Sequence, residues 1–178
     1  MFVYDINPIL FKIGFFEIRY YGIIYVFGFI LAYFLVKYLS SQRKINLKKE
    51  DVENLILYLA LGVVLCARLF YIVFYNLKYY IYKPLEMFAL WHGGLSFHGG
   101  LVGAFIVCYL FCRKKKIRFY TLVDILVIPA SLALFFGRIG NFINGELYGR
   151  ETTLPWAVKF PGVDGFRHPS QIYEALKN

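Results

Sequence analysis

Long apolar runs separated by short charged segments dominate this chain. There are four long runs, and a fifth run begins at Gln171 shortly before the sequence ends at Asn178. The pattern predicts an all-α, polytopic transmembrane helix bundle, a single integral-membrane domain over residues 1–178. A hydrocarbon core about 30 Å thick takes roughly 20 helical residues to cross. Four runs are long enough for a full span: 21–39, 55–75, 95–112 and 122–143.

Composition supports a membrane protein over a soluble domain. Hydrophobic residues make up 60% of the chain and charged residues 17%. A soluble fold rarely exposes apolar patches larger than a few hundred Å², so a bilayer is the natural solvent for this surface. The formal net charge of +9 does not indicate nucleic-acid binding, because the basic residues gather in short loops and not on one face. The three cysteines, an odd number in or beside apolar runs, suit packing better than disulfides or metal binding, and we expect no cofactor and no metal.

Loop charge predicts the orientation, since cytoplasmic loops carry the excess of Lys and Arg. The segments 43–49 and 113–118 are strongly basic, whereas 76–94 holds only Lys78 and Lys83. The two basic loops are two spans apart, so they lie on one side. We therefore expect both in the cytoplasm, with the N-terminus and the 76–94 loop outside.

Ionisable residues inside spans are candidate functional groups, because an arginine at a helix centre costs about 2.5–3.5 kcal/mol on the insertion scale. Arg68, His98 and Arg138 interrupt three spans, and the predicted orientation puts all three in the outer half of the membrane. This depth suits a site for an outer-leaflet lipid head group. Further polar residues at the same level are Tyr21, Asn141, Asn144 and Glu146.

Each candidate also has a structural interpretation. Arg68 could donate hydrogen bonds to backbone carbonyls or to Glu146. His98 could be a hydrogen-bonded histidine at the membrane surface without a catalytic role. Arg138 and Glu146 could form an ion pair that fixes the fold. Tyr21 could belong to the aromatic belt that tyrosines form at membrane surfaces. The predicted convergence of these residues at one depth favours a functional site.

Glycines flank these polar residues in two segments. Gly93, Gly94, Gly99 and Gly100 surround His98, and other glycines alternate with the polar residues of 137–150. Glycine lets a backbone approach a ligand or a neighbouring helix closely. Plain helix packing explains Gly99 and Gly103, which are four residues apart. Backbone N–H groups together with arginines would suit a phosphate.

Two segments, 94–101 (GLSFHGGL) and 137–150 (GRIGNFINGELYGR), are similar to signature segments of the prolipoprotein diacylglyceryl transferases. Shorter matches follow in family order: Tyr20-Tyr21-Gly22, Ala67-Arg68-Leu69 and 167–174 (RHPSQIYE). The resemblance implies a seven-helix enzyme of the bacterial inner membrane with its N-terminus outside and its active site facing the outer leaflet. The family continues through further spans and has another essential arginine there, so we interpret 1–178 as the N-terminal two thirds of a family chain.

The resemblance also implies an activity. Phosphatidylglycerol would donate its diacylglyceryl group to the lipobox cysteine thiol of a preprolipoprotein, the first step of lipoprotein maturation, and no nucleic acid would be involved. The family's essential residues fall on Tyr21, His98, Arg138, Asn141 and Glu146. We expect further substrate contacts from a second set: Arg138, Arg68, Gly99, Gly149 and Arg150.

The chemistry assigns roles to these residues. A cysteine thiol is mostly protonated at pH 7, and histidine is the side chain whose charge changes between pH 5 and 8, so we expect His98 to take the thiol proton. Arg138 should hold the phosphate, Asn141 and Tyr21 should bind head-group oxygens, and Glu146 should orient Arg138 or a substrate hydroxyl. A lipid transporter is the alternative, although transporter sites lie near the midplane between repeated halves, and no repeat is visible here.

Overall fold

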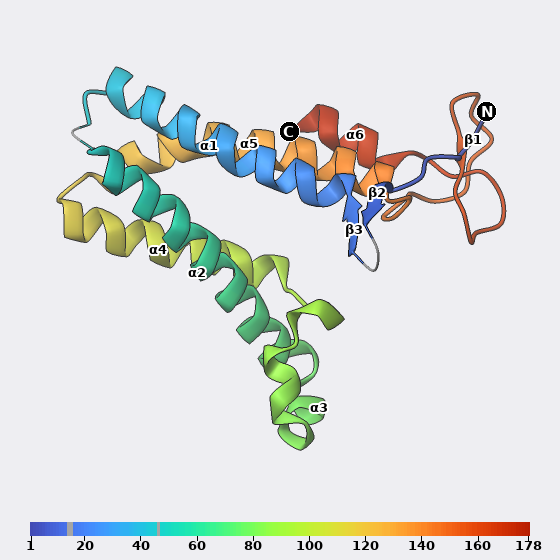
Figure 1. The fold of residues 1–178 in the computed structure, drawn as a ribbon, viewed down its shortest axis with the longest axis horizontal. Helices are drawn as coiled ribbons and strands as arrows, with labels where there is room; N and C mark the ends of the chain where they lie inside the picture. Colours follow the sequence, from blue (N-terminus) through green and yellow to red (C-terminus); the bar gives the residue numbers. More distant parts are fainter. Residues whose placement is uncertain (14–15, 46) are drawn as a thin grey trace. The chain divides into compact units, whose positions relative to one another are not determined.

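Four long helices carry the fold of the computed structural model, which describes residues 1–13, 16–45 and 47–178 (Figure 1). Their length and apolar composition are sufficient to cross a membrane, which confirms the four predicted spans and indicates a multi-pass membrane protein. They are α1 (Tyr20–Gln42), α2 (Lys49–Tyr75), α4 (Phe97–Lys115) and α5 (Phe119–Ile143).

Short elements join and flank these helices. Between α2 and α4 the chain forms α3 (Leu77–Tyr82) and the 3-10 turns η1 (Pro84–Phe88) and η2 (Leu90–His92). Helix α6 (Ser170–Lys177) begins one residue before the predicted fifth run. The short strands, which the sequence did not predict, are β1 (Phe2–Val3), β2 (Ile9–Ile13), β3 (Phe16–Arg19) and β4 (Val158–Lys159).

The helix ends differ from the apolar runs because polar caps add or remove turns. Helix α2 begins at Lys49, where Lys48 N–H donates to Asp51 Oδ2 at 3.1 Å. This acidic first turn suits a helix N-terminus, whose free N–H groups attract negative charge. Helix α4 begins at Phe97, because Ser96 Oγ accepts from the N–H of Gly99 at 3.4 Å and caps the helix.

The chain forms two compact units. One combines residues 1–35 and 127–178, and the other is 36–126. Both boundaries fall within helices, α1 and α5. We call them the terminal unit and the central unit, and a single membrane domain stays a prediction.

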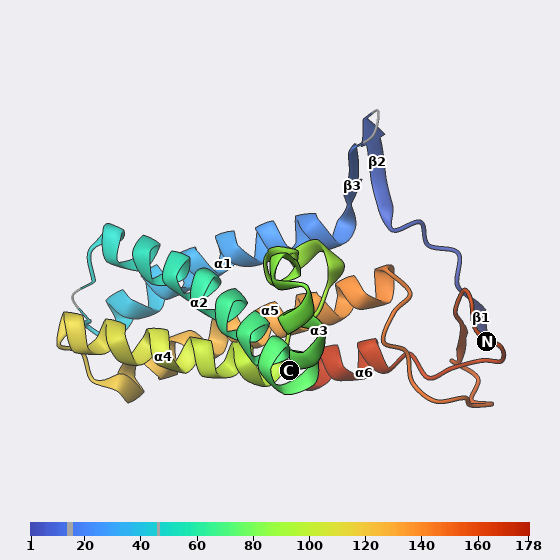
Figure 2. The same ribbon diagram turned by 90° about the horizontal axis from the view of Figure 1, so that it is seen from below.

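In the central unit, α2 and α4 lie side by side along their length (Figures 1 and 2). Glycines make this approach possible, since a Cβ at Gly103 would lie 2.8 Å from Cys66 Cβ, and one at Gly99 would lie 2.9 Å from Ala67 Cα. Real Cβ atoms essentially never approach so closely, so both positions need a hydrogen in place of a side chain. This contact confirms the packing interpretation of Gly99 and Gly103. An ion pair between Lys115 and buried Asp51 fixes the other end of the same helix pair.

The terminal unit pairs α1 with α5, and the rings of Phe27 and Phe136 meet edge to face at 5.5 Å. Strand β1 pairs in parallel with β4, and Phe2 lies opposite Val158. The ring of Tyr4 packs 5.5 Å from Phe160, which is 1% exposed and forms the centre of a small core under the 144–168 segment.

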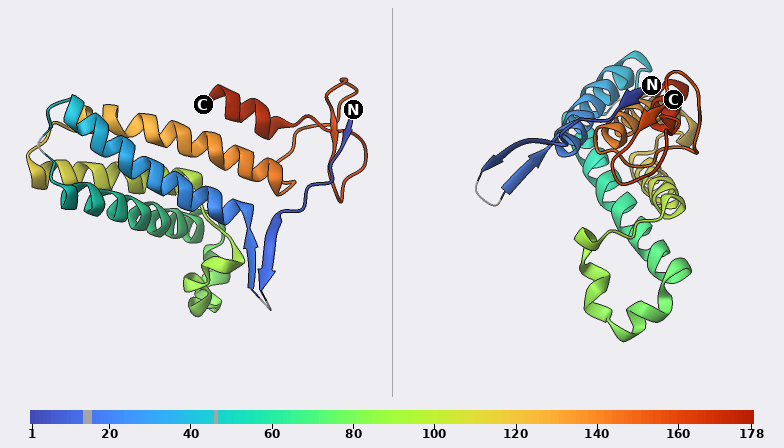
Figure 3. Two further views of the ribbon diagram at one scale, coloured as in Figure 1. Left: turned by 45° about the horizontal axis from the view of Figure 1, so that its top comes forward. Right: turned by 90° about the vertical axis from the view of Figure 1, so that its right-hand side faces the viewer.

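An antiparallel hairpin of β2 and β3 leads directly into α1 (Figure 3). Lys12 lies opposite Glu17 in this hairpin, and their side chains form an ion pair at 3.1 Å. Arg19 Nη2 lies 3.2 Å from the other carboxylate oxygen of Glu17. Hydrogen bonds from Lys12 and then Arg19 hold the pKa of the Glu17 carboxyl below its ordinary value.

Candidate functional site

The terminal unit brings three of the predicted residues into one connected array. Arg138 and Asn141 lie one turn apart on α5, and Arg138 Nη1 donates to Asn141 Oδ1 at 3.5 Å. Asn141 Nδ2 donates in turn to Glu146 Oε1 at 2.9 Å. Gly145 allows this return of the chain, because it turns at φ 68°, a conformation that suits glycine. The Glu146 N–H then donates to the Asn141 carbonyl at 3.0 Å.

Helix α6 completes the array with two residues that we did not predict as site residues. Glu174 Oε2 forms an ion pair with Arg138 Nη2 at 2.7 Å. Gln171 is 1% exposed, and its Nε2 donates to the Glu146 carbonyl at 2.6 Å. The carboxylate paired with Arg138 is therefore Glu174, and the pairing with Glu146 considered from the sequence was wrong, since Asn141 lies between them. A glutamine and a glutamate three residues apart, on one face of the helix that starts near Gln171, were the signal that the sequence offered.

Two buried acceptors beside this array have no hydrogen-bond partner among the described residues. They are Asn144 Oδ1 and Gln171 Oε1. The amide nitrogens of both side chains are used, since Asn144 Nδ2 donates to Glu146 Oε1 at 3.2 Å and Gln171 Nε2 donates to the Glu146 carbonyl. Buried polar atoms are nearly always paired, so each such atom needs an explanation, for example a ligand hydroxyl or water.

Tyr21 and Gly149 border the array through close packing. The Tyr21 ring lies against Gly140, where a Cβ would come within 2.7 Å of Cδ2. Gly149 lies against His168, whose carbonyl accepts the Gly149 N–H at 2.9 Å. The Arg150 carbonyl accepts the His168 N–H at 3.0 Å, while the Arg150 residue itself is exposed. Catalytic or binding roles for these residues stay predictions.

Arg68 belongs to the central unit and is 4% exposed. Its Nη2 donates to the carbonyl of Glu86 at 2.7 Å and to that of Ala89 at 3.2 Å, and its Nε donates to the Met87 carbonyl at 3.1 Å. Its Nη1 donates to the carbonyls of Gly93 and Gly94. The structure thus confirms that Arg68 bonds backbone carbonyls, one of the two structural alternatives. Its role as a phosphate ligand stays a prediction.

His98 and Gly99 also belong to the central unit. His98 is the second residue of α4 and is exposed, and its ring stands edge-on to Phe97 at 5.8 Å. The predicted residues therefore fall into two groups: Tyr21, Arg138, Asn141, Glu146, Gly149 and Arg150 in the terminal unit, and Arg68, His98 and Gly99 in the central unit. Within the described ranges, no group of three or more His, Cys, Asp or Glu is placed to hold a metal ion.

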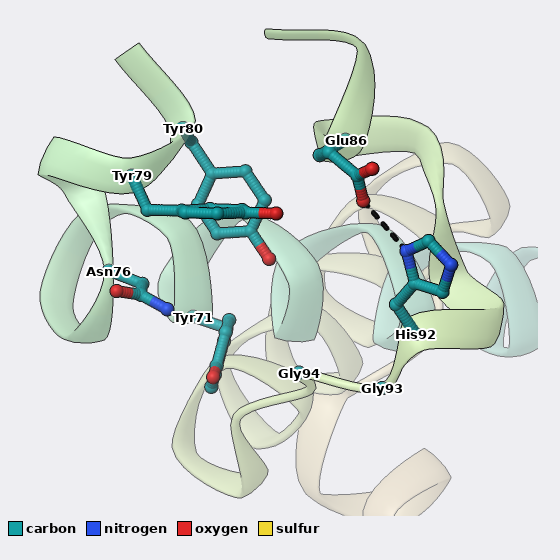
Figure 4. A pocket seen from close by; sticks show the side chains of 8 residues that line it. All are labelled: Tyr71, Asn76, Tyr79, Tyr80, Glu86, His92, Gly93 and Gly94. Atoms are coloured by element: carbon teal, nitrogen blue, oxygen red, sulfur yellow. Dashed lines mark hydrogen bonds and ion pairs between the residues drawn. The ribbon is translucent and has the colours of Figure 1, made fainter. Parts of the chain in front are cut away.

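The central unit also contains a pocket of about 280 Å³ that the sequence did not reveal (Figure 4). The end of α2 together with α3, η1 and η2 surrounds it. A hydrogen bond between His92 Nδ1 and Glu86 Oε2, 2.7 Å apart, forms one side. The described residues that line it are Tyr71, Asn76, Tyr79, Tyr80, Glu86, His92, Gly93 and Gly94.

Known proteins resemble this chain along almost its whole length. The phosphatidylglycerol–prolipoprotein diacylglyceryl transferase of Geobacter sulfurreducens is 51% identical over 172 residues, which cover 96% of this chain and 66% of that protein. The proteins of the same name from Bordetella parapertussis and Nitratidesulfovibrio vulgaris are 48% and 45% identical, over 96% of this chain and 66% and 65% of theirs. The chain thus spans just under two thirds of the length of these relatives.

The family model described as prolipoprotein diacylglyceryl transferase matches residues 8–178. This range contains both signature segments, all four long helices and the Arg138–Asn141–Glu146 array. The chain belongs to the prolipoprotein diacylglyceryl transferase family.

Proposed function

We propose that this protein transfers the diacylglyceryl group of phosphatidylglycerol to the thiol of the lipobox cysteine in a prolipoprotein. The names of its relatives give phosphatidylglycerol and prolipoprotein as the reactants. The single observation that best supports the transfer is the connected array of Arg138, Asn141 and Glu146. It offers a cation, an amide and a carboxylate within residues 138–146, where the cation suits the phosphate and the amide and carboxylate suit the hydroxyls of a glycerol head group.

The reaction is a displacement at the sn-3 glycerol carbon of the lipid. A carbon–sulfur bond forms, and the bond between that carbon and the phosphate oxygen breaks. The electron pair of the broken bond leaves with glycerol phosphate, and the thiol proton goes to a base. Catalysis therefore needs a thiolate on one side of the carbon and positive charge at the departing phosphate on the other.

Arg138 supplies the positive charge. Its guanidinium is planar and can hold two phosphate oxygens at once. Glu174 occupies part of this guanidinium at 2.7 Å, so lipid binding exchanges a carboxylate for a phosphate without leaving Arg138 unpaired. Asn141 and Tyr21 bind head-group oxygens, and Glu146 orients Arg138 through Asn141.

The unpartnered oxygens of Asn144 and Gln171 support a head group that carries hydroxyls. Both atoms are buried acceptors next to Glu146. A glycerol head group has two free hydroxyl donors, one for each acceptor. An ethanolamine or serine head group would offer ammonium donors instead, which would lie close to the Arg138 cation.

His98 is the base in this proposal. It is exposed at the first turn of α4, where a substrate thiol can reach it. The proposed setting is the bacterial inner membrane, with the N-terminus outside and the site open to the outer leaflet. The basic segments 43–49 and 113–118 support that orientation.

The test is a transfer assay on the protein expressed from its complete reading frame. Phosphatidylglycerol with labelled acyl chains and a lipobox peptide are supplied in vesicles, and label on the cysteine is measured. His98→Ala should lower transfer by roughly 10²-fold or more, the usual scale for losing a general base. Transfer within a few-fold of wild type, in a folded variant, would mean that His98 is structural. Movement of intact labelled lipid between leaflets, without label on cysteine, would support the transporter instead.

Arg138→Lys separates a phosphate ligand from a structural charge. Lysine keeps the charge but loses the planar fork, and the two are not interchangeable at bidentate sites. We expect Arg138→Lys to insert normally and to bind phosphatidylglycerol poorly. Glu174→Gln is the matched variant, because it breaks the same ion pair and leaves the guanidinium intact. If both variants lose thermal stability and activity in parallel, Arg138 serves the fold and the phosphate assignment fails.

A further inference from the structure

The pocket belongs to the central unit, whereas the array around Arg138 belongs to the terminal unit, and the pocket lining has its own chemistry. Tyrosine hydroxyls and the Asn76 amide lie on one side of it, and the Glu86–His92 pair lies on the other (Figure 4). Tyrosine hydroxyls and amides both donate and accept hydrogen bonds. Gly93 and Gly94, at φ 78° and 83°, present bare backbone to the same space.

Charge at the pocket disfavours an ionic ligand of either sign. Glu86 would repel a phosphate, and among the described lining residues the basic side chain is His92, which is already paired with Glu86 at 2.7 Å. Arg68 would repel a cation, since its guanidinium lies 5.1 Å from the centre of the Tyr80 ring in the pocket wall. A neutral ligand rich in both donors and acceptors fits best.

The wall is also held rigidly in place. Arg68 ties η1 to the residues on both sides of η2, Ala89 and then Gly93 and Gly94, through five backbone carbonyls in all. The N–H of Ser96 donates to the Ala67 carbonyl at 3.0 Å, which fixes to α2 the extended segment that leads from the pocket into α4. Tyrosines beside small Gly and Asn residues are also the composition with which antibody loops bind their antigens. A fixed wall of this kind loses little entropy when a peptide binds.

The position along the chain suggests which peptide. Gly94 lies at the pocket, and His98, the proposed base, follows within the first turn of α4. The pocket volume of about 280 Å³ is close to the lower end of ordinary ligand sites, roughly 300–1,000 Å³. That size suits a short stretch of chain and not a folded domain.

We infer that this pocket binds the uncharged polar segment that follows the target cysteine in the prolipoprotein. The inference rests on the proposed function, because that function makes a prolipoprotein the partner. The tyrosine hydroxyls and Asn76 exchange hydrogen bonds with the peptide backbone, and the Glu86–His92 pair closes the far side. The pocket then determines how the chain beyond the cysteine leaves the catalytic site.

Two fluorescent peptides with the same lipobox test this inference. The short peptide ends at the cysteine amide, and the long one continues with six uncharged polar residues. Both are titrated against the protein in nanodiscs, and transfer is measured in parallel. Tyr79→Phe should weaken binding of the long peptide about threefold to tenfold, the range for one neutral hydrogen bond. It should leave the short peptide unaffected. Tyr82→Phe is the matched control, because Tyr82 lies in the same helix, is 76% exposed and does not line the pocket.

Every outcome decides the matter. Equal losses for both peptides, or no loss for either, overturn the inference. Loss of the Tyr79 effect in excess glycerol phosphate also overturns it, since the pocket would then hold a head group. A protein that binds the long peptide through Tyr79 but transfers no lipid keeps the pocket and refutes the proposed function. If transfer is normal and Tyr79→Phe and Tyr82→Phe bind the long peptide equally well, the proposed role of the pocket is refuted and the proposed function is kept.

Discussion

Replacement of Arg68 with methionine should release the segment 84–94 while leaving α2 and α4 intact. Methionine has a similar length and fills the space, but it donates no hydrogen bonds. The carbonyls of Glu86 and Ala89 would keep a second partner, because they also accept the N–H groups of Ala89 and His92. The structure gives the carbonyls of Met87, Gly93 and Gly94 no other partner among the described residues.

The magnitude follows from these three carbonyls. An acceptor left unpaired costs about 1–3 kcal/mol, and partial hydration of a surface segment favours the lower end of that range. The loss of the cation–π contact with Tyr80 adds about 1 kcal/mol. The segment should therefore open about 4–5 kcal/mol more easily, which corresponds to roughly 10³-fold faster hydrogen exchange in the regime where exchange follows the open population.

Hydrogen exchange with mass spectrometry, on protein in nanodiscs, measures this directly for peptides covering 84–94. Arg68→Lys should give an intermediate rate, since an ammonium has three donors in place of five. Arg113→Met is the control, because Arg113 Nη1 donates to the hydroxyl of the exposed Tyr109 side chain. Unchanged exchange in Arg68→Met together with lost phosphatidylglycerol binding would refute the role of Arg68 in holding residues 84–94 and would establish Arg68 as a phosphate ligand.

Three further predictions address the membrane orientation, the helix pair and the hairpin. A reporter fused within 113–118 should read cytoplasmic and one at Tyr79 external; the reverse pair of results would move the site to the inner leaflet. Gly103→Val should lower the stability of the protein in detergent by about 1–3 kcal/mol through overpacking, whereas Gly28→Val, where a Cβ meets nothing within 4 Å, should leave thermal unfolding unchanged. The Glu17 pKa is lowered in the hairpin, so its stabilising effect is full above the ordinary glutamate pKa of about 4.3 and is lost as pH falls through the folded-state value. The protection of amides in β2 and β3, measured against the intrinsic exchange rate at each pH, should therefore fall below about pH 4.3 in wild type and show no such step in Glu17→Gln.

The long helices could be predicted from sequence because hydrocarbon imposes one requirement on every residue of a span. The helix ends were less accurate, since Ser96 and Asp51 act through single hydrogen bonds at the edges of the apolar runs. The strands were missed for a different reason. Phe2 and Val3 pair with residues near 158, and so short a strand leaves no periodic pattern in the sequence.

Polarity within a span identified Arg68 and Arg138 but did not identify their partners. Both lie at sites where a charge needs compensation, yet Arg68 found five carbonyls and Arg138 found Glu174. Partner choice depends on how the 76–94 and 144–170 segments fold back, and no local preference of the sequence encodes that. The buried Gln171 was missed because glutamine is mostly exposed in proteins, so its presence near a helix start does not predict burial.

The pairing of β1 with β4 has a consequence for biosynthesis. At about 5–20 residues per second, the ribosome completes Val158 roughly 8–30 s after Phe2, so the first residues wait unpaired while all four long helices are made. This segment then docks through its backbone, since the N–H groups of Phe2 and Tyr4 donate to the carbonyls of Ala157 and Lys159 at 2.9 and 3.0 Å. An affinity tag at the N-terminus would thus disturb a late step in maturation, at a distance of over 150 residues along the chain, and leave insertion of the first helix untouched.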